Sequence, residues 1–296
     1  MADELDRPIV ILGAARSGTT LLAQLLEAHP DLVLWLEAKY LWRYRQPPGD
    51  PDTRAGGDAT PEVKRYIRRR LKAFVDRGDG RRLLEKTPSN CFRVPFVDAV
   101  LPGARYVHVI RDGRDVAVSA RQIWDSREET GFWQRLSRRE MPTRDLPAYA
   151  LPTARRLLRR QIGASEAAVW GPVYPGMRED ACRLSRLELC GMQWMRSVEA
   201  AEAGLAGIDD SRVTTIRFET LVGAPEETIA GLLAFLELAD EGSVPRRVVE
   251  ELSGGSKARL HRADPVEFAG LTEQLRPLLV RLGYLRAGAA ARSPGS

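Results

Sequence analysis

Residues 13–20, with the sequence GAARSGTT, have the types and spacing of a loop that binds an anion. The pattern G-x-x-x-x-G-T-T is that of a Walker A loop, except that Thr19 stands where a lysine is expected. Such a loop points backbone N–H groups and the start of a helix toward one place, which suits a phosphate or a sulfate. The missing lysine normally reaches the β and γ phosphates of a nucleoside triphosphate. The sequence therefore disfavours ATP and GTP and favours another phosphorylated nucleotide.

Two further candidate cations lie just beyond predicted strands. Lys86 follows a short strand expected at 82–85, and Arg111 follows a buried strand expected at 104–110. Because the carboxyl ends of parallel strands meet at one edge of a sheet, both cations and the 13–20 loop can converge on one crevice. The plain alternatives are a surface lysine after a strand and a local ion pair of Arg111 with the aspartate that follows it.

The elements that must position these residues alternate between strands and helices. The continuous apolar run at 9–12 is typical of a parallel strand that is covered on both faces, and a helix follows the 13–20 loop. Further strands are expected at 32–36 and 213–218, and further helices at 61–76, from about 89, from about 116, and at 180–203, 225–236, 245–252 and 265–283. This alternation predicts a three-layer α/β fold with a mostly parallel sheet flanked by helices.

The length of 296 residues, 44% of them hydrophobic, fits one large domain, which we expect to cover 1–286. The stretch 124–178 differs in character, because it is rich in arginine, tryptophan and proline, and it is predicted to be a lid or insertion. The tail 287–296, AGAAARSPGS, is expected to be disordered.

The composition bounds the partners and the compartment. The formal net charge is +5 and the pI is near 9.3, but basic and acidic residues are interleaved. An anionic small molecule explains this excess, so we expect no nucleic-acid partner. The acidic N-terminus does not look like a secretory signal, and no apolar run approaches the roughly 20 residues of a membrane span. The three cysteines lack metal-ligand spacing, so we expect reduced thiols in a cytoplasmic protein without a metal or membrane partner.

Two motifs, in this order, resemble the nucleotide-binding signatures of sulfotransferases that use 3′-phosphoadenosine 5′-phosphosulfate (PAPS). They are AARSGTTLL at 14–22 and RYVHVIRDGRDVAVSA at 105–120, and the segment at 215–238 is also similar to that family. The resemblance spans about 8–238 and weakens between 124 and 180. It implies transfer of a sulfuryl group from PAPS to a hydroxyl of a small-molecule, sugar or peptide acceptor, without a metal ion. The product nucleotide would be 3′-phosphoadenosine 5′-phosphate (PAP), and the insertion would cover the acceptor pocket.

The resemblance assigns the nucleotide to residues from four parts of the chain. The 5′-phosphosulfate is assigned to the loop residues Arg16, Ser17, Gly18, Thr19 and Thr20. The 3′-phosphate is assigned to Arg111 and Ser119, and an arginine at a strand end can clamp a phosphate together with a serine two turns into the next helix.

Two parts of the chain depart from the family pattern. The YED-like strand end of the family is Arg217-Phe218-Glu219 here, where Phe218 could still stack on adenine. The C-terminal phosphate loop is matched only loosely, and the predicted nucleotide contacts there are Ser256 and Lys257.

Catalysis in this family needs a base for the acceptor proton and cations on the departing phosphate. Glu37, eight residues after His29, matches the general base of protein-tyrosine sulfotransferases, and its plain alternative is an exposed loop carboxylate. In many cytosolic small-molecule sulfotransferases the base is a histidine in a K-T-H segment, but Pro88 occupies that position here, which favours Glu37. Lys86 and Arg16 are the predicted cations.

Two other classes of function stay open from the sequence. A P-loop nucleotide kinase would need a Walker lysine and a magnesium-holding aspartate, and Thr19 counts against it. A catalytically silent nucleotide-binding protein would bind the bisphosphate nucleotide tightly but would form no sulfated product. The identity of the acceptor and the oligomeric state, a homodimer included, also stay open.

Overall fold

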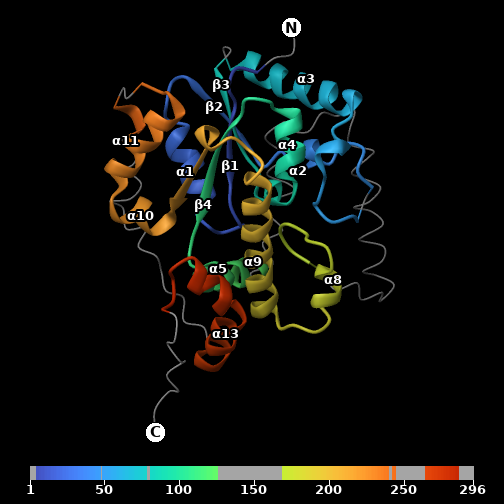
Figure 1. Cartoon of the computed structure of the whole chain (residues 1–296), viewed down its shortest axis with the longest axis vertical. Helices are drawn as coiled ribbons and strands as arrows, with labels where there is room; N and C mark the ends of the chain where they lie inside the picture. The colour runs from blue at the N-terminus through green and yellow to red at the C-terminus, as the bar shows by residue number, and fades with distance from the viewer. Residues whose placement is uncertain are drawn as a thin grey trace.

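The computed structural model describes residues 5–47, 49–78, 81–125, 169–239, 242–244 and 264–286. Within these ranges, five strands form one sheet in the order β2-β3-β1-β4-β5, and every pairing is parallel (Figure 1). The strands are β1 (Ile9–Leu12), β2 (Leu32–Leu36), β3 (Arg82–Lys86), β4 (Arg105–Ile110) and β5 (Val213–Arg217). The predicted α/β fold with a parallel sheet flanked by helices is confirmed.

Helices connect the strands and cover both faces of the sheet. The α-helices are α1 (Thr19–Leu26), α2 (Lys39–Trp42), α3 (Pro61–Arg77), α4 (Val94–Val100), α5 (Gly113–Asp125), α8 (Met177–Asp180), α9 (Arg186–Leu205), α10 (Phe218–Gly223), α11 (Pro225–Leu236) and α13 (Pro265–Arg281). Short 3-10 turns are η1 (Gly56–Asp58), η2 (Pro88–Arg93) and η4 (Asp210–Arg212). None of the described helices is long and apolar enough to cross a membrane.

Three helices begin at different residues from those predicted. The helix expected from about 89 starts as the 3-10 turn η2 and becomes α4 at Val94, and capping explains the other two shifts. α5 begins at Gly113 rather than near 116, because the Asp112 carboxylate accepts the Arg114 N–H at 2.9 Å and so satisfies the first turn. α9 begins at Arg186 rather than 180, after Ser185 and Glu188 form a capping box. The helix predicted at 245–252 lies outside the described residues.

The apolar run of β1 alternates between two cores. Val10 and Leu12 pack in a cluster with side chains of α3 and α4, whereas Ile9 and Ile11 pack in a cluster with α1 and α11. In Figure 1, α1 and α11 accordingly lie on one side of the sheet, and α4 and α9 lie on the other. Each fully buried side chain of this size contributes about 1.5–3 kcal/mol, so the central strand is held from both faces.

The parallel register brings the carboxyl ends of four strands to one edge of the sheet. Leu36 of β2 lies opposite Lys86 of β3, which in turn lies opposite Ile11 of β1. β4 is in register on the other side of β1. The segments that follow these strands, including the 13–20 loop, Glu37 and Arg111, therefore meet at this edge.

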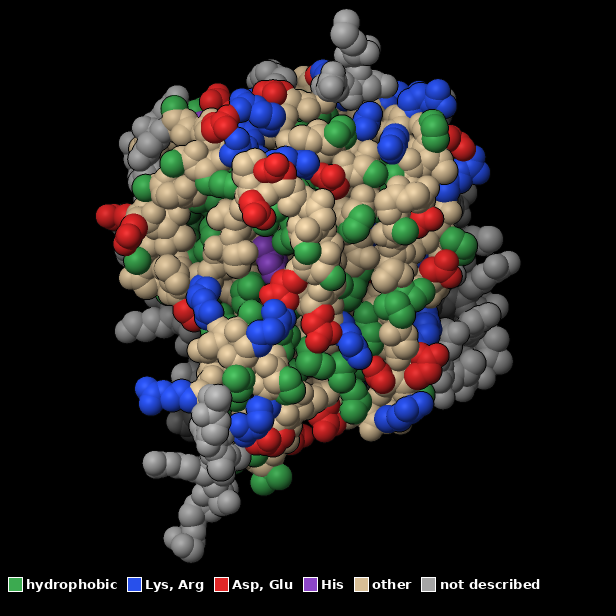
Figure 2. Space-filling model, in the orientation of Figure 1, with side chains coloured by type: hydrophobic (Ala, Val, Ile, Leu, Met, Phe, Trp, Pro, Cys, Tyr) green, Lys and Arg blue, Asp and Glu red, His purple; other side chains and the backbone are tan. Residues whose placement is uncertain are grey.

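Charged side chains of both signs are mixed on the face that Figure 2 shows. Lysine and arginine lie next to aspartate and glutamate there, in agreement with the interleaved charges of the sequence.

The contact between α5 and α9 provides a test of the packing. A Cβ atom on Gly113 would lie 2.3 Å from the ring of the buried Trp194, whereas a Cβ on Gly231 in α11 would meet nothing within 4 Å. We expect Gly113→Ala to destabilise the protein by about 1–3 kcal/mol through overpacking. Gly231→Ala should stabilise it by about 0.5–1 kcal/mol, because alanine has the higher helix propensity. Urea denaturation measures both, and a neutral Gly113→Ala would contradict the close contact.

Candidate active site

The loop between β1 and α1 has the backbone form of an anion cradle. Gly18 has φ 92° and Arg16 has φ 75°, so the chain turns through two left-handed residues before the helix begins. A Cβ on Gly13 would lie 2.7 Å from the Thr19 methyl group, and a Cβ on Gly18 would lie 2.2 Å from the ring of Phe218. Both positions thus require glycine, because the neighbouring atoms leave no room for a Cβ. The N-terminus of α1 points toward this loop.

Two buried side chains support this loop. The Gly13 N–H donates to Cys91 Sγ at 3.2 Å, and burial raises the pKa of the Cys91 thiol to about 12, so the sulfur acts as a neutral acceptor. Ser17 is fully buried, and its hydroxyl has no partner among the described residues. Buried hydroxyls are nearly always hydrogen-bonded, so Ser17 is an exception among the described residues, and its contact with a nucleotide stays a prediction.

The structure brings together three of the predicted phosphate ligands. Arg16 Nε donates to Ser119 Oγ at 3.2 Å, and Arg111 Nη1 lies 3.5 Å from the main-chain oxygen of Arg16. Burial and the positive charge of Arg111 lower the pKa of Arg16, while the negative charge of Glu37 opposes this shift. Two guanidinium groups held so close repel each other, and a bound anion would relieve that repulsion.

Phe218 lies beneath the guanidinium group of Arg111. Its ring is 4.4 Å from the Arg111 guanidinium, it packs against Gly18, and the residue is 7% exposed. The next residue, Glu219, accepts the Asp112 N–H at 3.0 Å and the Tyr284 hydroxyl at 2.9 Å. The ring therefore supports Arg111 by a cation–π contact, and its stacking on adenine stays a prediction.

Glu37 and Lys86 form an ion pair at the ends of β2 and β3. Lys86 Nζ donates to Glu37 Oε1 at 3.1 Å, and the Glu37 N–H donates to the Lys86 carbonyl at 2.7 Å. The Lys86 side chain is 2% exposed, whereas that of Glu37 is 42% exposed. Glu37 has φ 59°, a left-handed conformation that costs about 1–3 kcal/mol and is found mainly at functional sites. The predicted base therefore stands open to solvent beside a buried cation.

A buried carboxylate next to this pair was missed by sequence analysis. Glu85 precedes Lys86 in β3 and accepts hydrogen bonds from Trp42 Nε1 at 2.8 Å, Asn90 Nδ2 at 3.0 Å and the Thr87 hydroxyl. Burial raises the pKa of Glu85 to about 7, although these hydrogen bonds oppose the shift. The signal in the sequence was a charged residue inside an otherwise buried strand.

Neither described histidine is placed as a base. His108 is buried in β4, and burial lowers its pKa to about 4, so it is a neutral core residue. His29 lies at the end of α1, where Nε2 is 2.8 Å from the Ala239 carbonyl and Nδ1 accepts the Asp31 N–H. Of the residues considered as the base, Glu37 thus stays the candidate.

Several predicted features lie outside the described residues. They are Ser256, Lys257, the tail 287–296 and most of the insertion, 126–168. In the part of the chain that is described, no group of three or more His, Cys, Asp or Glu side chains could hold a metal ion.

The parallel sheet and its glycine-bounded loop define an α/β fold of the P-loop type. Residues 8–146 match the sulfotransferase family. The nodulation protein NoeE of Sinorhizobium fredii is 30% identical over 129 residues, which are 38% of this chain and 31% of NoeE. An uncharacterized protein of Aquifex aeolicus is 28% identical over 130 residues, or 38% of this chain and 16% of that protein. The alignments thus span less than a third of each curated relative.

Two solved structures have the same fold. The sulfotransferase domain from the curacin biosynthetic pathway gives a TM-score of 0.51 at 16% identity, and covers 92% of this chain and 98% of that chain. Sulfotransferase STF1 from Mycobacterium tuberculosis gives 0.52 at 14% identity, and covers 93% and 78%. The sulfotransferase match thus covers a little less than half of the chain, and these solved structures agree with it in fold.

The raised pKa of Glu85 predicts how stability depends on pH. At pH values between 4.5, the ordinary pKa of a glutamate, and about 7, the folded protein holds a proton on Glu85 that the unfolded chain releases. This stabilisation is complete below pH 4.5 and is lost as the pH rises through 7. Between pH 4.5 and 8, the wild type should therefore lose about 3 kcal/mol of unfolding free energy relative to Glu85→Gln, because glutamine does not titrate. Urea titrations of both proteins across this range measure the difference, and a difference that does not change with pH would contradict the buried protonated carboxyl.

Proposed function

We propose that this sulfotransferase takes its sulfuryl group from PAPS, transfers it to a hydroxyl group of its acceptor and releases PAP. The observation that carries the proposal is the Glu37–Lys86 ion pair, 3.1 Å long, beside the anion-binding loop. A solvent-accessible carboxylate next to a buried ammonium group supplies the two functions that the transfer needs, a base and a cation.

The nucleotide would be held at both of its phosphate groups. The loop residues Arg16 to Thr20 would bind the 5′-phosphosulfate through backbone N–H groups, hydroxyls and one guanidinium. Arg111 and Ser119 would bind the 3′-phosphate. The contact between Arg16 and Ser119 supports this assignment, because it brings the two predicted phosphate positions next to each other.

The transfer itself can be written with these residues. Glu37 accepts the proton of the acceptor hydroxyl as its oxygen attacks sulfur. The bond between sulfur and the bridging phosphate oxygen breaks, and PAP leaves with an additional negative charge. Lys86 and Arg16 stabilise that charge, and the loss of one such contact typically costs about 3 kcal/mol of barrier.

The acceptor is a hydroxyl compound whose class, whether phenol, sugar, peptide or secondary-metabolite alcohol, is decided by experiment. The protein is incubated with ³⁵S-labelled PAPS and pools of hydroxyl compounds, and labelled products are separated and identified. Sulfated product supports the proposal. Magnesium-dependent ATP turnover would instead support a nucleotide kinase, and tight PAP binding without any product would support a silent nucleotide-binding protein.

Glu37→Gln tests the base. We expect the rate of transfer to fall by about 100-fold or more, because a general base contributes roughly 10²–10⁴-fold. PAP affinity, measured by calorimetry, should stay nearly unchanged, because glutamine has the same shape. Glu27→Gln, at the exposed end of α1, is the matched control and should behave as the wild type. Retained turnover in Glu37→Gln would remove Glu37 from the role of base.

Arg111→Ala tests the 3′-phosphate site. We expect PAP to bind about 10–100-fold more weakly, since one charged hydrogen-bonding partner is lost. The affinity for AMP, which lacks the 3′-phosphate, should change little. Arg121→Ala in α5, the helix that follows Arg111, is the control: Arg121 pairs with Glu267, and its loss should leave both affinities unchanged. Equal losses for PAP and AMP in Arg111→Ala would contradict the assignment.

A further inference from the structure

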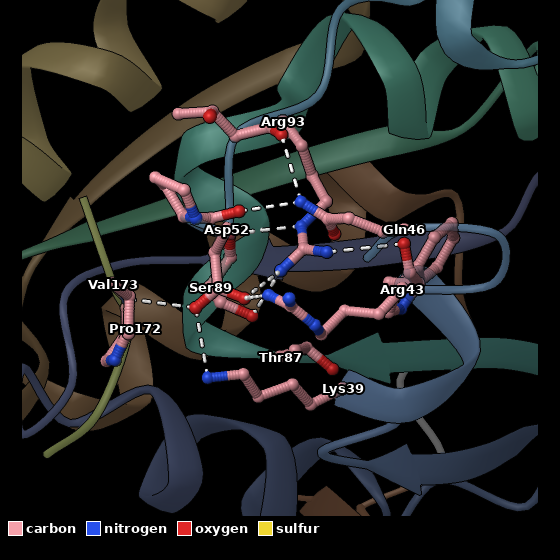
Figure 3. Close-up of polar contacts among 12 residues, drawn as sticks. Lys39, Arg43, Gln46, Asp52, Thr87, Ser89, Arg93, Pro172 and Val173 are labelled. Atoms are coloured by element: carbon pink, nitrogen blue, oxygen red, sulfur yellow. Dashed lines mark hydrogen bonds and ion pairs between the residues drawn. The ribbon is translucent and has the colours of Figure 1, made fainter. Parts of the chain in front are cut away.

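A second polar cluster lies next to α2 and is centred on Asp52, whose side chain is fully buried (Figure 3). Three cations meet its carboxylate: Arg43 Nη1 at 2.7 Å, Lys39 Nζ at 2.9 Å and Arg93 Nη2 at 3.2 Å. The Val173 N–H also donates to Asp52 Oδ2 at 2.8 Å, and the Asp52 N–H donates to the Val173 carbonyl at 2.7 Å. Asp52 thus accepts hydrogen bonds from Arg43, Lys39 and Val173, forms an ion pair with Arg93, and donates one hydrogen bond to Val173.

The cluster is an internal connection and not a site for an external anion. Besides Asp52, its three cations donate to main-chain carbonyl groups, which belong to Pro47, Asp50, Ser89, Trp42 and Gly171. The donors are therefore used within the protein. Buried ion networks of this kind add little stability compared with apolar packing, and their best-attested role is to fix one geometry.

The segments that Asp52 joins are those that carry the Glu37–Lys86 pair. Lys39, the first residue of α2, lies two residues after Glu37, and its N–H donates to the Glu37 carbonyl at 2.7 Å. Arg93 ends η2, which follows Lys86 after one intervening residue. In Figure 3 these side chains converge on Asp52 from α2 and from the segment after β3. None of the contacts described for Asp52 goes to the 13–20 loop or to α5.

The backbone of Glu37 needs such support. A left-handed conformation at a glutamate, here with φ 59°, persists only where the surrounding structure over-determines it. On one side, the Glu37 N–H is fixed to the Lys86 carbonyl. On the other side, its carbonyl is fixed to the start of α2, and α2 is held in turn by Asp52.

We propose that Asp52 is a positioning residue, which holds α2 against η2 and Val173 and so keeps Glu37 in the left-handed conformation that brings its carboxylate to Lys86. Its importance for catalysis rests on the proposed role of Glu37 as the base. The structural part of the proposal can be tested without an acceptor.

Hydrogen exchange of backbone amides, measured by NMR or mass spectrometry on the full chain, tests the positioning. In Asp52→Asn, the Glu37 and Val173 amides should exchange about 10-fold faster or more, because the local opening becomes easier. The amides of β1 and β4 should keep their protection, and PAP affinity should stay within about 2-fold of the wild type. Asp98→Asn, which removes a partly buried partner of Arg212, is the control and should leave Glu37 unchanged.

Two exchange results would overturn the proposal. One is an unchanged Glu37 amide in Asp52→Asn. The other is a loss of protection spread evenly over the whole chain, which would mean general destabilisation. If Asp52→Asn does not fold, Lys39→Met is used instead. It removes one cation of the cluster, whose side chain is 36% exposed and contacts Asp52 and the Gly171 carbonyl, and the same two amides are followed.

A double-mutant cycle tests the catalytic part with an acceptor from the labelled-donor screen. Asp52→Asn should lower turnover by about 10–100-fold in the wild-type background, as a misplaced catalytic group does. In the Glu37→Gln background it should add little further loss, because Asp52 acts through Glu37. Fully additive losses would overturn the proposal. If no acceptor gives product while exchange follows the expected pattern, the proposed chemistry fails and the positioning role stands.

Discussion

The parallel pairing of β2 with β3 is the constraint on which the candidate site depends. It places Leu36 opposite Lys86, so the next residue, Glu37, has its main chain within reach of the Lys86 carbonyl. The Lys86 side chain is 2% exposed, and a buried ammonium group without a partner would be costly. The Glu37 carboxylate removes that cost in the free protein. The ion pair that stabilises this edge of the sheet is therefore the same pair to which the proposed transfer assigns a base and a cation.

The positively charged side chains of the site lie in two different environments. Lys86 is balanced by a carboxylate, whereas the pKa of Arg16 is lowered by burial and by the positive charge of Arg111. Phe218 places its ring 4.4 Å from Arg111, which gives that guanidinium a favourable contact that is not an anion. Arg111 also pairs with Asp115, Nη2 to Oδ2 at 3.6 Å, so the positive charge on the side of the loop is balanced in part within the protein. The proposed doubly phosphorylated nucleotide would supply further negative charge there.

Local patterns predicted the sheet and the convergence of its strand ends, because a buried parallel strand such as Ile9–Leu12 is a continuous apolar run. They did not predict the supporting carboxylates. Asp52 lies in a stretch rich in Pro, Gly and Asp that reads as a surface loop, and its burial depends on Val173, 121 residues away. Glu85 is fixed by Trp42, which belongs to the neighbouring α2. Such contacts are set by tertiary packing, which a single sequence does not display.

The two buried carboxylates next to the site differ in charge because their neighbours differ. Burial alone would raise the pKa of Asp52, but the cations Lys39 and Arg93 lower it below its ordinary value, so Asp52 is ionised. Glu85 is contacted by neutral donors, so burial prevails and its pKa rises to about 7. Both carboxylates hold α2, Asp52 as a charged group and Glu85 as a group whose pKa of about 7 makes its protonation change around neutral pH. α2 begins two residues after Glu37, and its Trp42 donates to Glu85. Ionisation of Glu85 therefore acts on the helix that holds the candidate base, and not on the Glu37 carboxylate directly.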